Sequence, residues 1–273
     1  RVAKAFNAST TIVDVGEKVS EFSSKLVGLT QERMESWDFD RPGIDVLEWA
    51  FSYLAKKKFI EPKQIQSGFP KNTLVEKNSR RSEVFLKGTV SDQVNLILRS
   101  GDIIEELRDE VQSEFYNVTI IGGSGKRDMA HDLVQYIDSS IFVVKNFTSN
   151  QKYRILCAVD DSPKTRKAVK YTVRIAQAFN IGVDILTISN KGELKPSSKL
   201  AAEQAEKFMR RCGIEAKNLY DEGEPSKKIV EIAGNNNIII MGASTQSPIA
   251  KYFRGSKPLK VMKNCDCPVL IVK

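Results

Sequence analysis

The sequence predicts an α/β protein made of two tandem units, each built on a five-stranded parallel sheet, with the first unit lacking its opening strand. Two observations lead to this prediction. The chain of 273 residues repeats itself, and within each copy short apolar runs alternate with amphipathic segments. Strands that are apolar on both faces are typical of a parallel sheet covered by helices, because parallel neighbours need long crossover connections.

The repeat is seen in three pairs of segments that occur in the same order in both copies. The matching segments are 1–15 with 174–188, 99–107 with 221–229, and 141–145 with 269–273. Self-similarity in a fixed order indicates two copies of one fold. We therefore predict one domain over residues 1–147 and a second over residues 151–273.

The copies differ at the start and in the middle. The first copy has no counterpart of residues 153–173, so we expect it to lack its opening strand and most of its first helix. It also carries an insertion of about fifty residues within 17–93. Apolar residues at three- and four-residue spacing around Trp49 predict an amphipathic helix there, with Trp37 and Trp49 in a small local core rather than in an exposed partner-binding stripe. The polar stretch 61–81 reads as a loop.

In the second copy, strands and helices alternate throughout. The predicted strands are 154–159, 183–188, 215–220, 238–241 and 269–272, and the predicted helices are 163–180, 197–212, 225–234 and 257–264. Ligands of open parallel sheets bind beyond the carboxyl ends of the strands, where the strand order reverses. The loops after the first, second and fourth strands are therefore the place to look for a site.

The composition narrows the class of protein. A chain that is 41% hydrophobic and 28% charged is globular, and no apolar run approaches the roughly 20 residues that cross a bilayer. The net charge of +8 is spread along the chain, which predicts a solvated surface and no nucleic-acid partner. Four cysteines form neither a disulfide framework nor a four-ligand metal cluster, and we expect a cytoplasmic protein.

Three motifs give no catalytic or metal site. The run Gly122–Lys126 lacks the spacing of a P-loop, because Ile120 stands where a glycine is required and Arg127 follows the lysine. His131 has no nucleophile in a recognised arrangement. The Cys265-x-Cys267 motif has no second pair at ligand spacing and is expected to be structural. We predict no catalytic residue and no enzyme activity.

The second copy resembles the universal stress protein family over essentially all of residues 153–273. The residues that carry the resemblance are Cys157 to Ser162, Gly223, Met241-Gly242, Gly255-Ser256 and Cys267 to Val272. The resemblance implies the Rossmann-like fold of that family. Its nucleotide-binding members have a phosphate loop that reads G-x-x-G, nine residues, then G-S or G-T.

The resemblance implies that ATP or AMP is bound at this loop. Gly242 stands at the first glycine, and Gly255 with Ser256 closes the motif at a helix start, where free N–H groups favour phosphate. Thr245 replaces the second glycine. A β-branched residue disfavours positive φ and leaves less space for the phosphates to approach the loop backbone, so we predict that the nucleotide binds weakly or not at all. The simpler reading of these residues is a tight turn and a helix cap.

Two further residues take their expected roles from the same resemblance. Asp160 would hydrogen-bond the adenine or ribose side of the nucleotide, and Ile188 would give main-chain contacts to the base. Asp160 can equally cap the helix that begins near Pro163. The two roles of Asp160 do not exclude each other.

The resemblance also implies how the copies associate. Family members typically pair through their last strands, here 141–144 and 269–272, which would join the copies as an intramolecular pseudo-dimer. The first copy is a degenerate partner, because it keeps the glycine spacing of 122–125 but not the Gly-Ser that follows. We also expect whole chains to form a homodimer.

Two functions follow from these expectations. The first is a non-enzymatic regulator or sensor of the universal stress protein type, with ATP or AMP bound in the second copy. The alternative is the cytosolic regulatory domain of a secondary transporter, of the cation–chloride cotransporter or amino-acid permease type, with the membrane portion upstream of Arg1. ATP hydrolysis is disfavoured, because the phosphate loop has no Walker lysine, positioned base or metal carboxylate pair.

Overall fold

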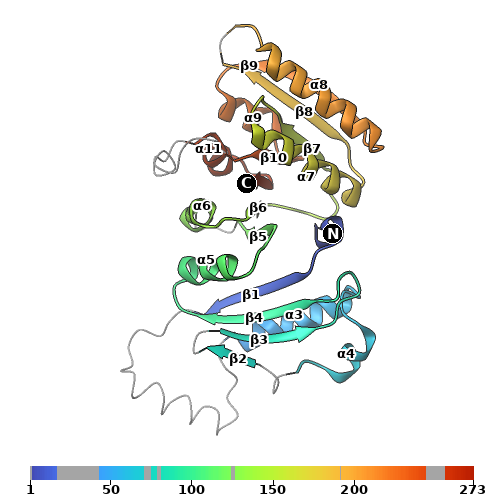
Figure 1. Cartoon of the computed structure of the whole chain (residues 1–273), viewed down its shortest axis with the longest axis vertical. Coiled ribbons are helices and arrows are strands. Elements are labelled where there is room, and N and C mark those ends of the chain that lie inside the picture. Colours follow the sequence, from blue (N-terminus) through green and yellow to red (C-terminus); the bar gives the residue numbers. More distant parts are fainter. Residues whose placement is uncertain are drawn as a thin grey trace. The chain divides into compact units, whose positions relative to one another are not determined.

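The computed structural model describes residues 2–16, 43–70, 75–78, 81–123, 127–190, 192–243 and 256–273. They form two compact units, one of Arg1–Ala5 with Val111–Lys273 and the other of Phe6–Glu110. Both units combine a β-sheet with packed helices (Figure 1), so the predicted α/β class is confirmed.

The larger unit contains a seven-stranded sheet in the order β5-β6-β11-β10-β7-β8-β9. Its strands are β5 (Val118–Gly122), β6 (Ser140–Val144), β7 (Arg154–Ala158), β8 (Val183–Ser189), β9 (Ala216–Glu222), β10 (Asn237–Gly242) and β11 (Val269–Val272). All neighbours are parallel except β6 and β11. The five strands predicted for the second copy are all present.

Helices of the second copy begin where the sequence supplies a proline. They are α7 (Pro163–Phe179), α8 (Pro196–Arg211), α9 (Pro225–Ala233) and α11 (Lys257–Asn264). Proline opens the first three and is the second residue of α11, because its fixed φ suits the first helical turn and its missing N–H is not needed there. Helix α7 packs on β7, β10 and β11, and α8 packs on β8 and β9, so each covers the apolar strands beneath it.

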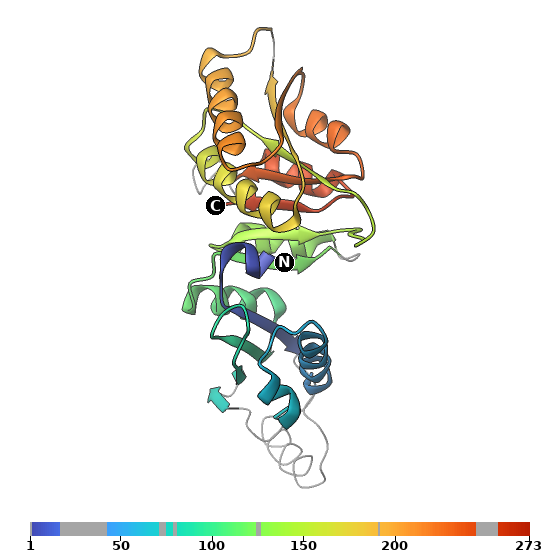
Figure 2. The ribbon, with the colours of Figure 1, turned by 90° about the vertical axis from the view of Figure 1, so that its right-hand side faces the viewer.

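Strands β6 and β11 join the two copies in an antiparallel pair. Ile141 lies opposite Ile271, Phe142 opposite Leu270, and Val143 opposite Val269. Figure 2 shows the green strands β5 and β6 beside the red strand β11. The predicted pairing of the last strands is therefore present within one chain.

The smaller unit has a four-stranded sheet in the order β1-β4-β3-β2. The strands are β1 (Thr10–Gly16), β2 (Val75–Asn78), β3 (Arg81–Leu86) and β4 (Val94–Ser100), and the helices of the insertion are α3 (Ile44–Lys56) and α4 (Pro62–Ser67). Strands β1 and β4 are parallel, whereas β3 is antiparallel to both of its neighbours. In the described ranges the chain also has α1 (Val2–Phe6), α5 (Ile103–Ser113) and α6 (Arg127–Tyr136), of which α6 belongs to the larger unit.

The insertion corrects two expectations from the sequence. The amphipathic helix is confirmed as α3, but the predicted loop 61–81 contains α4 and β2, so that prediction was wrong. Trp49 is 66% exposed, so the prediction that Trp49 lies in a local core was wrong. Leu47 and Phe51 face the core of this unit, and Trp49 lies between them in sequence, about 200° around the helix from each. Trp37 lies outside the described residues.

The first copy differs from the expected single sheet, because its strands belong to two sheets. Strands β5 and β6 extend the sheet of the second copy, whereas β1 and β4 form a sheet with β3 and β2 of the insertion, in which β4 is the strand next to β3. In the second copy β7 lies between β8 and β10 and links the two pairs of outer strands. The described part of the first copy has no strand in this place, so its two pairs are separate. The compact units thus differ from the repeats 1–147 and 151–273, whose boundaries stay a prediction.

Candidate functional site

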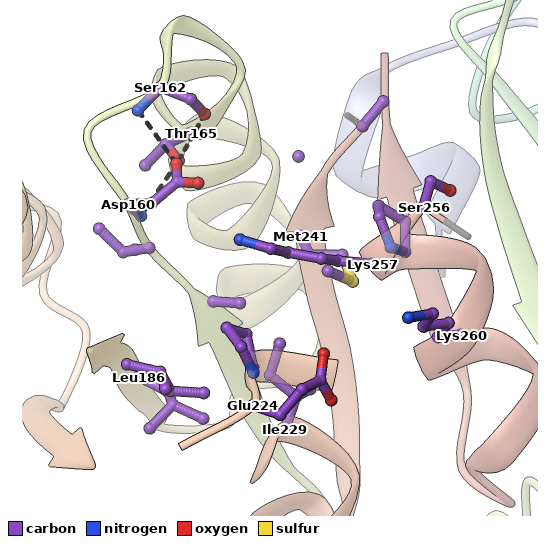
Figure 3. A pocket seen from close by; sticks show the side chains of 17 residues that line it. Asp160, Ser162, Thr165, Leu186, Glu224, Ile229, Met241, Ser256, Lys257 and Lys260 are labelled. Carbon is purple, nitrogen blue, oxygen red and sulfur yellow. Dashed lines mark hydrogen bonds between the residues drawn. The ribbon is translucent and has the colours of Figure 1, made fainter. Parts of the chain in front are cut away.

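A cavity of about 390 Å³ lies at the carboxyl ends of β7, β8 and β10, where the sequence predicted the site. Its lining residues come from five segments of the second copy, and Figure 3 shows their side chains around the cavity. Four of the six predicted site residues line it, namely Asp160, Ile188, Gly242 and Ser256. Thr245 and Gly255, the other two, lie outside the described residues. The volume is within the range of small-molecule sites.

Asp160 is held at the wall of the cavity by the start of α7. Its Oδ1 accepts hydrogen bonds from the Ser162 N–H at 3.0 Å and from the Thr165 hydroxyl at 2.6 Å. The first of these closes an Asx turn that leads into the helix. Among the described residues Oδ2 has no partner, so Asp160 can order the helix entry with one oxygen and offer the other to a ligand.

The charge of Asp160 is stabilised in this position. Desolvation at the cavity wall would raise the pKa of Asp160, but hydrogen bonds from Ser162 and Thr165 and the charge of Lys257 outweigh it and hold the pKa below its ordinary value. Figure 3 shows Lys257 extending over the cavity toward Asp160. Asp160 is therefore a carboxylate at neutral pH, suited to accept hydrogen bonds and poorly suited to take a proton.

Ile188 offers main-chain groups at the end of β8. Leu186 accepts a hydrogen bond from the Val159 N–H at 2.9 Å, on the side of β7. Backbone groups alternate sides along a strand, so the N–H and C=O of Ile188 face that same side. Strand β7 has already ended at Ala158, and in the described residues the loop after it supplies no backbone partner for Ile188. One donor and one acceptor are thus directed at the cavity.

Gly242 ends β10 against the first turn of α7. A Cβ at this position would lie 2.9 Å from the Cβ of Lys164 and 3.1 Å from its carbonyl carbon. Such contacts are too short for any side chain to be accommodated without a shift of the helix. The glycine is thus explained by packing, and it also leaves the backbone bare at the cavity.

Helix α11 gives the cavity a positive end. Ser256 is its N-cap residue, yet the hydroxyl makes no capping hydrogen bond to the helix. The N–H of Lys257 lies in the first helical turn, where amides have no intrahelical acceptor. The side chains of Lys257 and Lys260 line the same part of the cavity. A hydroxyl, free amides, a helix dipole and two ammonium groups favour an anion here.

Between these polar ends the cavity is apolar. Leu186, Ile229 and Met241 line it and are themselves buried. Aliphatic and thioether groups on opposite walls form a surface against which a planar ring can pack. The cavity therefore combines a carboxylate, a main-chain donor and acceptor, an apolar slot and a cationic end.

Several lining residues that contribute polar groups, Glu224 among them, were not predicted from the sequence. Thr165 supports Asp160, and Lys257 and Lys260 supply the positive charge. Their signal was present in the sequence, since Lys257 directly follows Ser256 of the glycine motif and precedes a helix-starting proline. The described part of the chain has no group of three or more histidine, cysteine, aspartate or glutamate residues that could hold a metal ion.

The helices bear on membrane association in one respect. Among those that the structure describes, none is both long enough and apolar enough to cross a bilayer.

Comparison with known proteins gives matches over the second copy and over the whole chain. The model of the Universal stress protein family matches residues 153–273. A universal stress protein of Methanocaldococcus jannaschii is 26% identical over 159 residues, which cover 52% of this chain and 92% of that protein. One of Bacillus subtilis is 24% identical over 145 residues, covering 44% of this chain and 98% of that protein.

The fold as a whole is similar to a solved structure. The crystal structure of a universal stress protein from Archaeoglobus fulgidus has a TM-score of 0.58 at 14% identity, covering 100% of this chain and 91% of that one. The likeness in fold thus extends beyond residues 153–273.

Proposed function

Residues 153–273 are a universal stress protein domain, and on this premise we propose that the chain binds an adenine nucleotide, ATP or AMP, and acts as a non-enzymatic regulator. The observation that carries the proposal is a set of groups around one cavity for which the described residues supply no partner. The main chain of Ile188, Oδ2 of Asp160 and the amino-terminal end of α11 all face it.

Each part of an adenine nucleotide has a complementary part of the cavity. The base fits the apolar slot beside Ile188, whose C=O can accept from the exocyclic amine and whose N–H can donate to a ring nitrogen. Oδ2 of Asp160 can accept from a ribose hydroxyl. The phosphates meet Ser256, Lys257 and Lys260, where charge-assisted hydrogen bonds are strong.

The absence of catalysis is part of the proposal and has its own support. In the described residues the acidic groups at the cavity are Asp160 and Glu224. Oδ1 of Asp160 is engaged by Ser162 and Thr165, and Glu224 caps α9 by accepting from the Lys227 N–H at 2.9 Å. A carboxylate with a lowered pKa is a weak general base. The transporter hypothesis stays a prediction, since it concerns residues upstream of Arg1.

Calorimetric titration tests the proposal with four ligands, AMP, IMP, ATP and adenosine. We expect AMP to bind and IMP to bind at least about tenfold more weakly, because IMP presents a carbonyl oxygen where Ile188 C=O expects a donor. Adenosine should bind more weakly than ATP, because it leaves the cationic end empty. Equal affinity for AMP and IMP would contradict the assignment of Ile188.

Variants of α11 test the phosphate end. Combining Lys257→Ala with Lys260→Ala should weaken ATP binding by about tenfold or more and adenosine binding by less than about twofold. Lys263→Ala is the matched control, since Lys263 is exposed on the same helix and does not line the cavity. A Thr245→Gly variant should bind more tightly. If neither this variant nor the unaltered protein binds any nucleotide while both remain folded, the proposal fails.

A further inference from the structure

Lys145, from the first copy, reaches into the second copy at the far end of α11. It follows β6, and its Nζ donates hydrogen bonds to the carbonyl oxygens of Met262 at 2.6 Å and Cys265 at 3.2 Å. The next residue, Asn146, donates to the Asp266 carbonyl at 3.1 Å. The first copy thus binds the carboxyl end of the helix whose amino end lines the cavity.

Lys273 makes the same contact in the opposite direction. It follows β11 in the second copy, and its Nζ donates to the carbonyl oxygens of Val134, at 2.7 Å, and Ile137. These carbonyls end α6, the last helix of the first copy. In each copy the two acceptors lie three residues apart, and one constant offset in the sequence relates the lysines and both acceptor pairs.

The strand pairing has the symmetry that this exchange requires. Ile141 and Val269 are equivalent positions of the repeat, as are Val143 and Ile271. In the sheet Ile141 lies opposite Ile271, and the equivalent pair, Val269 and Val143, also lie opposite each other. Exchanging the two copies therefore leaves the pairing unchanged. This is the pattern of an isologous interface, with a local two-fold axis at the pair of Phe142 and Leu270.

An ammonium group at the end of α11 has a clear physical effect. The last carbonyls of a helix have no intrahelical donor and lie at the negative end of the dipole, so a cation there satisfies them and favours the helix. Cys265 closes α11 and is buried, and its thiol lies 3.9 Å from the Met262 carbonyl oxygen, farther away than the Lys145 ammonium at 2.6 Å. Because α11 has only eight residues and is about 12 Å long, fixing one end constrains the other.

We propose that Lys145 is a positioning residue for the phosphate end of the nucleotide site, supplied by the first copy to the second. This inference rests on the proposed function. Lys145 holds the carboxyl end of α11, and α11 carries Ser256, Lys257 and Lys260 at the cavity. The first copy thus contributes to a ligand site without having to bind nucleotide itself.

Gly123 provides a second way to disturb this contact. A Cβ at Gly123 would collide with Cγ of Lys145, because the lysine stem runs across the backbone there. Gly123→Ala should therefore displace the Lys145 ammonium without removing its charge. Lys145→Arg should preserve binding, since a guanidinium can also donate to two carbonyls.

The test compares Lys145→Met with Lys273→Met, which removes the equivalent contact from α6 and leaves α11 intact. AMP and ATP affinity is measured by calorimetry, and hydrogen exchange of the α6 and α11 amides is measured without nucleotide. We expect Lys145→Met and Gly123→Ala to weaken ATP binding by about three- to tenfold and to speed exchange in α11. Lys273→Met should change affinity by less than about twofold and speed exchange in α6.

The outcomes separate this inference from the proposed function. If the unaltered protein binds ATP and a folded Lys145→Met variant binds it equally well, the role of Lys145 is refuted and the proposed function stands. If both lysine variants weaken binding to the same extent, the effect is general destabilisation and the positioning role is again refuted. If the unaltered protein binds no nucleotide, the proposed function falls, and the role of Lys145 at the site falls with it.

Discussion

Replacing Arg99 with methionine should destabilise the unit of Phe6–Glu110 strongly. Arg99 lies on β4 and its side chain is 8% exposed. Its guanidinium contacts Glu106 at 2.6 Å and Glu110 at 2.7 Å, and both of these α5 residues are buried. Arg81 also contacts Glu110, at 2.9 Å, and Glu83. Two arginines thus serve three buried carboxylates.

The magnitude follows from the charges that the substitution leaves behind. Without Arg99, the buried carboxylates of Glu106 and Glu110 each lose their ion pair with this guanidinium. Breaking a buried ion pair by removing one partner costs about 3–5 kcal/mol, since the other charge stays buried without its partner. For a urea m value of about 1–3 kcal/mol/M, the midpoint of unfolding should fall by about 1 M or more.

Tryptophan fluorescence reports on this unit selectively. The chain has two tryptophans, at positions 37 and 49, and both fall within Phe6–Glu110. The matched control is Arg108→Met on α5, where the arginine is 38% exposed and pairs with Asp109 at 3.2 Å. An exposed pair of this kind contributes less than about 1 kcal/mol. Equal urea midpoints for the two variants would refute the assignment of a buried, stabilising cluster.

Three further predictions concern the second copy. The lowered pKa of Asp160 contributes stability that is present above its ordinary pKa of 3.8 and is lost as the pH falls below that value. In a plot of melting temperature against pH, Asp160→Asn should therefore remove the fall at acidic pH that this carboxylate causes. An unchanged plot would count against the hydrogen-bonded carboxylate. Gly242→Ala should lower the free energy of unfolding by about 1–3 kcal/mol, because its Cβ would lie 2.9 Å from the Cβ of Lys164; a urea midpoint equal to that of the unaltered protein would show that α7 moves aside freely. Burial raises the pKa of Cys157 to about 11, so mass spectrometry should find it alkylated long after the half-buried Cys212, and the reverse order would show that β7 opens readily.

The sequence was sufficient for the second copy because its signals are local. Strand β10 is a run of isoleucines that ends in Met241 and Gly242, and helix starts are marked by proline. The topology of a parallel sheet then brings Asp160, Ile188, Gly242 and Ser256 to one edge although they are distant in sequence. Four of the six predicted site residues could be placed together for this reason.

The segment 61–81 of the insertion was harder to predict, because it contains proline and leads into a strand with buried charged residues. Arg81 and Glu83 lie in β3, are buried and pair with each other, but Arg81 also needs Glu110, which lies on α5 far along the chain. A polar segment of this kind reads as a loop when its partners are unknown. Pro62 was taken as a loop residue, whereas it occupies the first turn of α4, a position that proline favours.

The contacts of Lys145 and Lys273 with the opposite copy could not be predicted from the sequence. Lys145 and Lys273 were visible as matching ends of the repeat, but lysine is common on surfaces and its usual role there is solvation. Only the antiparallel pairing of β6 with β11 shows that each lysine reaches the opposite copy.

The same strand pairing sets an order of events during synthesis. The ribosome synthesises residues 141–143 well before residues 269–271, so β6 cannot pair with β11 until more than a hundred further residues have been translated. Until then the edge of β6 that will pair with β11, at Phe142 and Val143, has unpaired backbone groups that can pair with a strand of another chain. Rapid folding of the second copy as it emerges would shorten that wait and protect the nascent chain from aggregation.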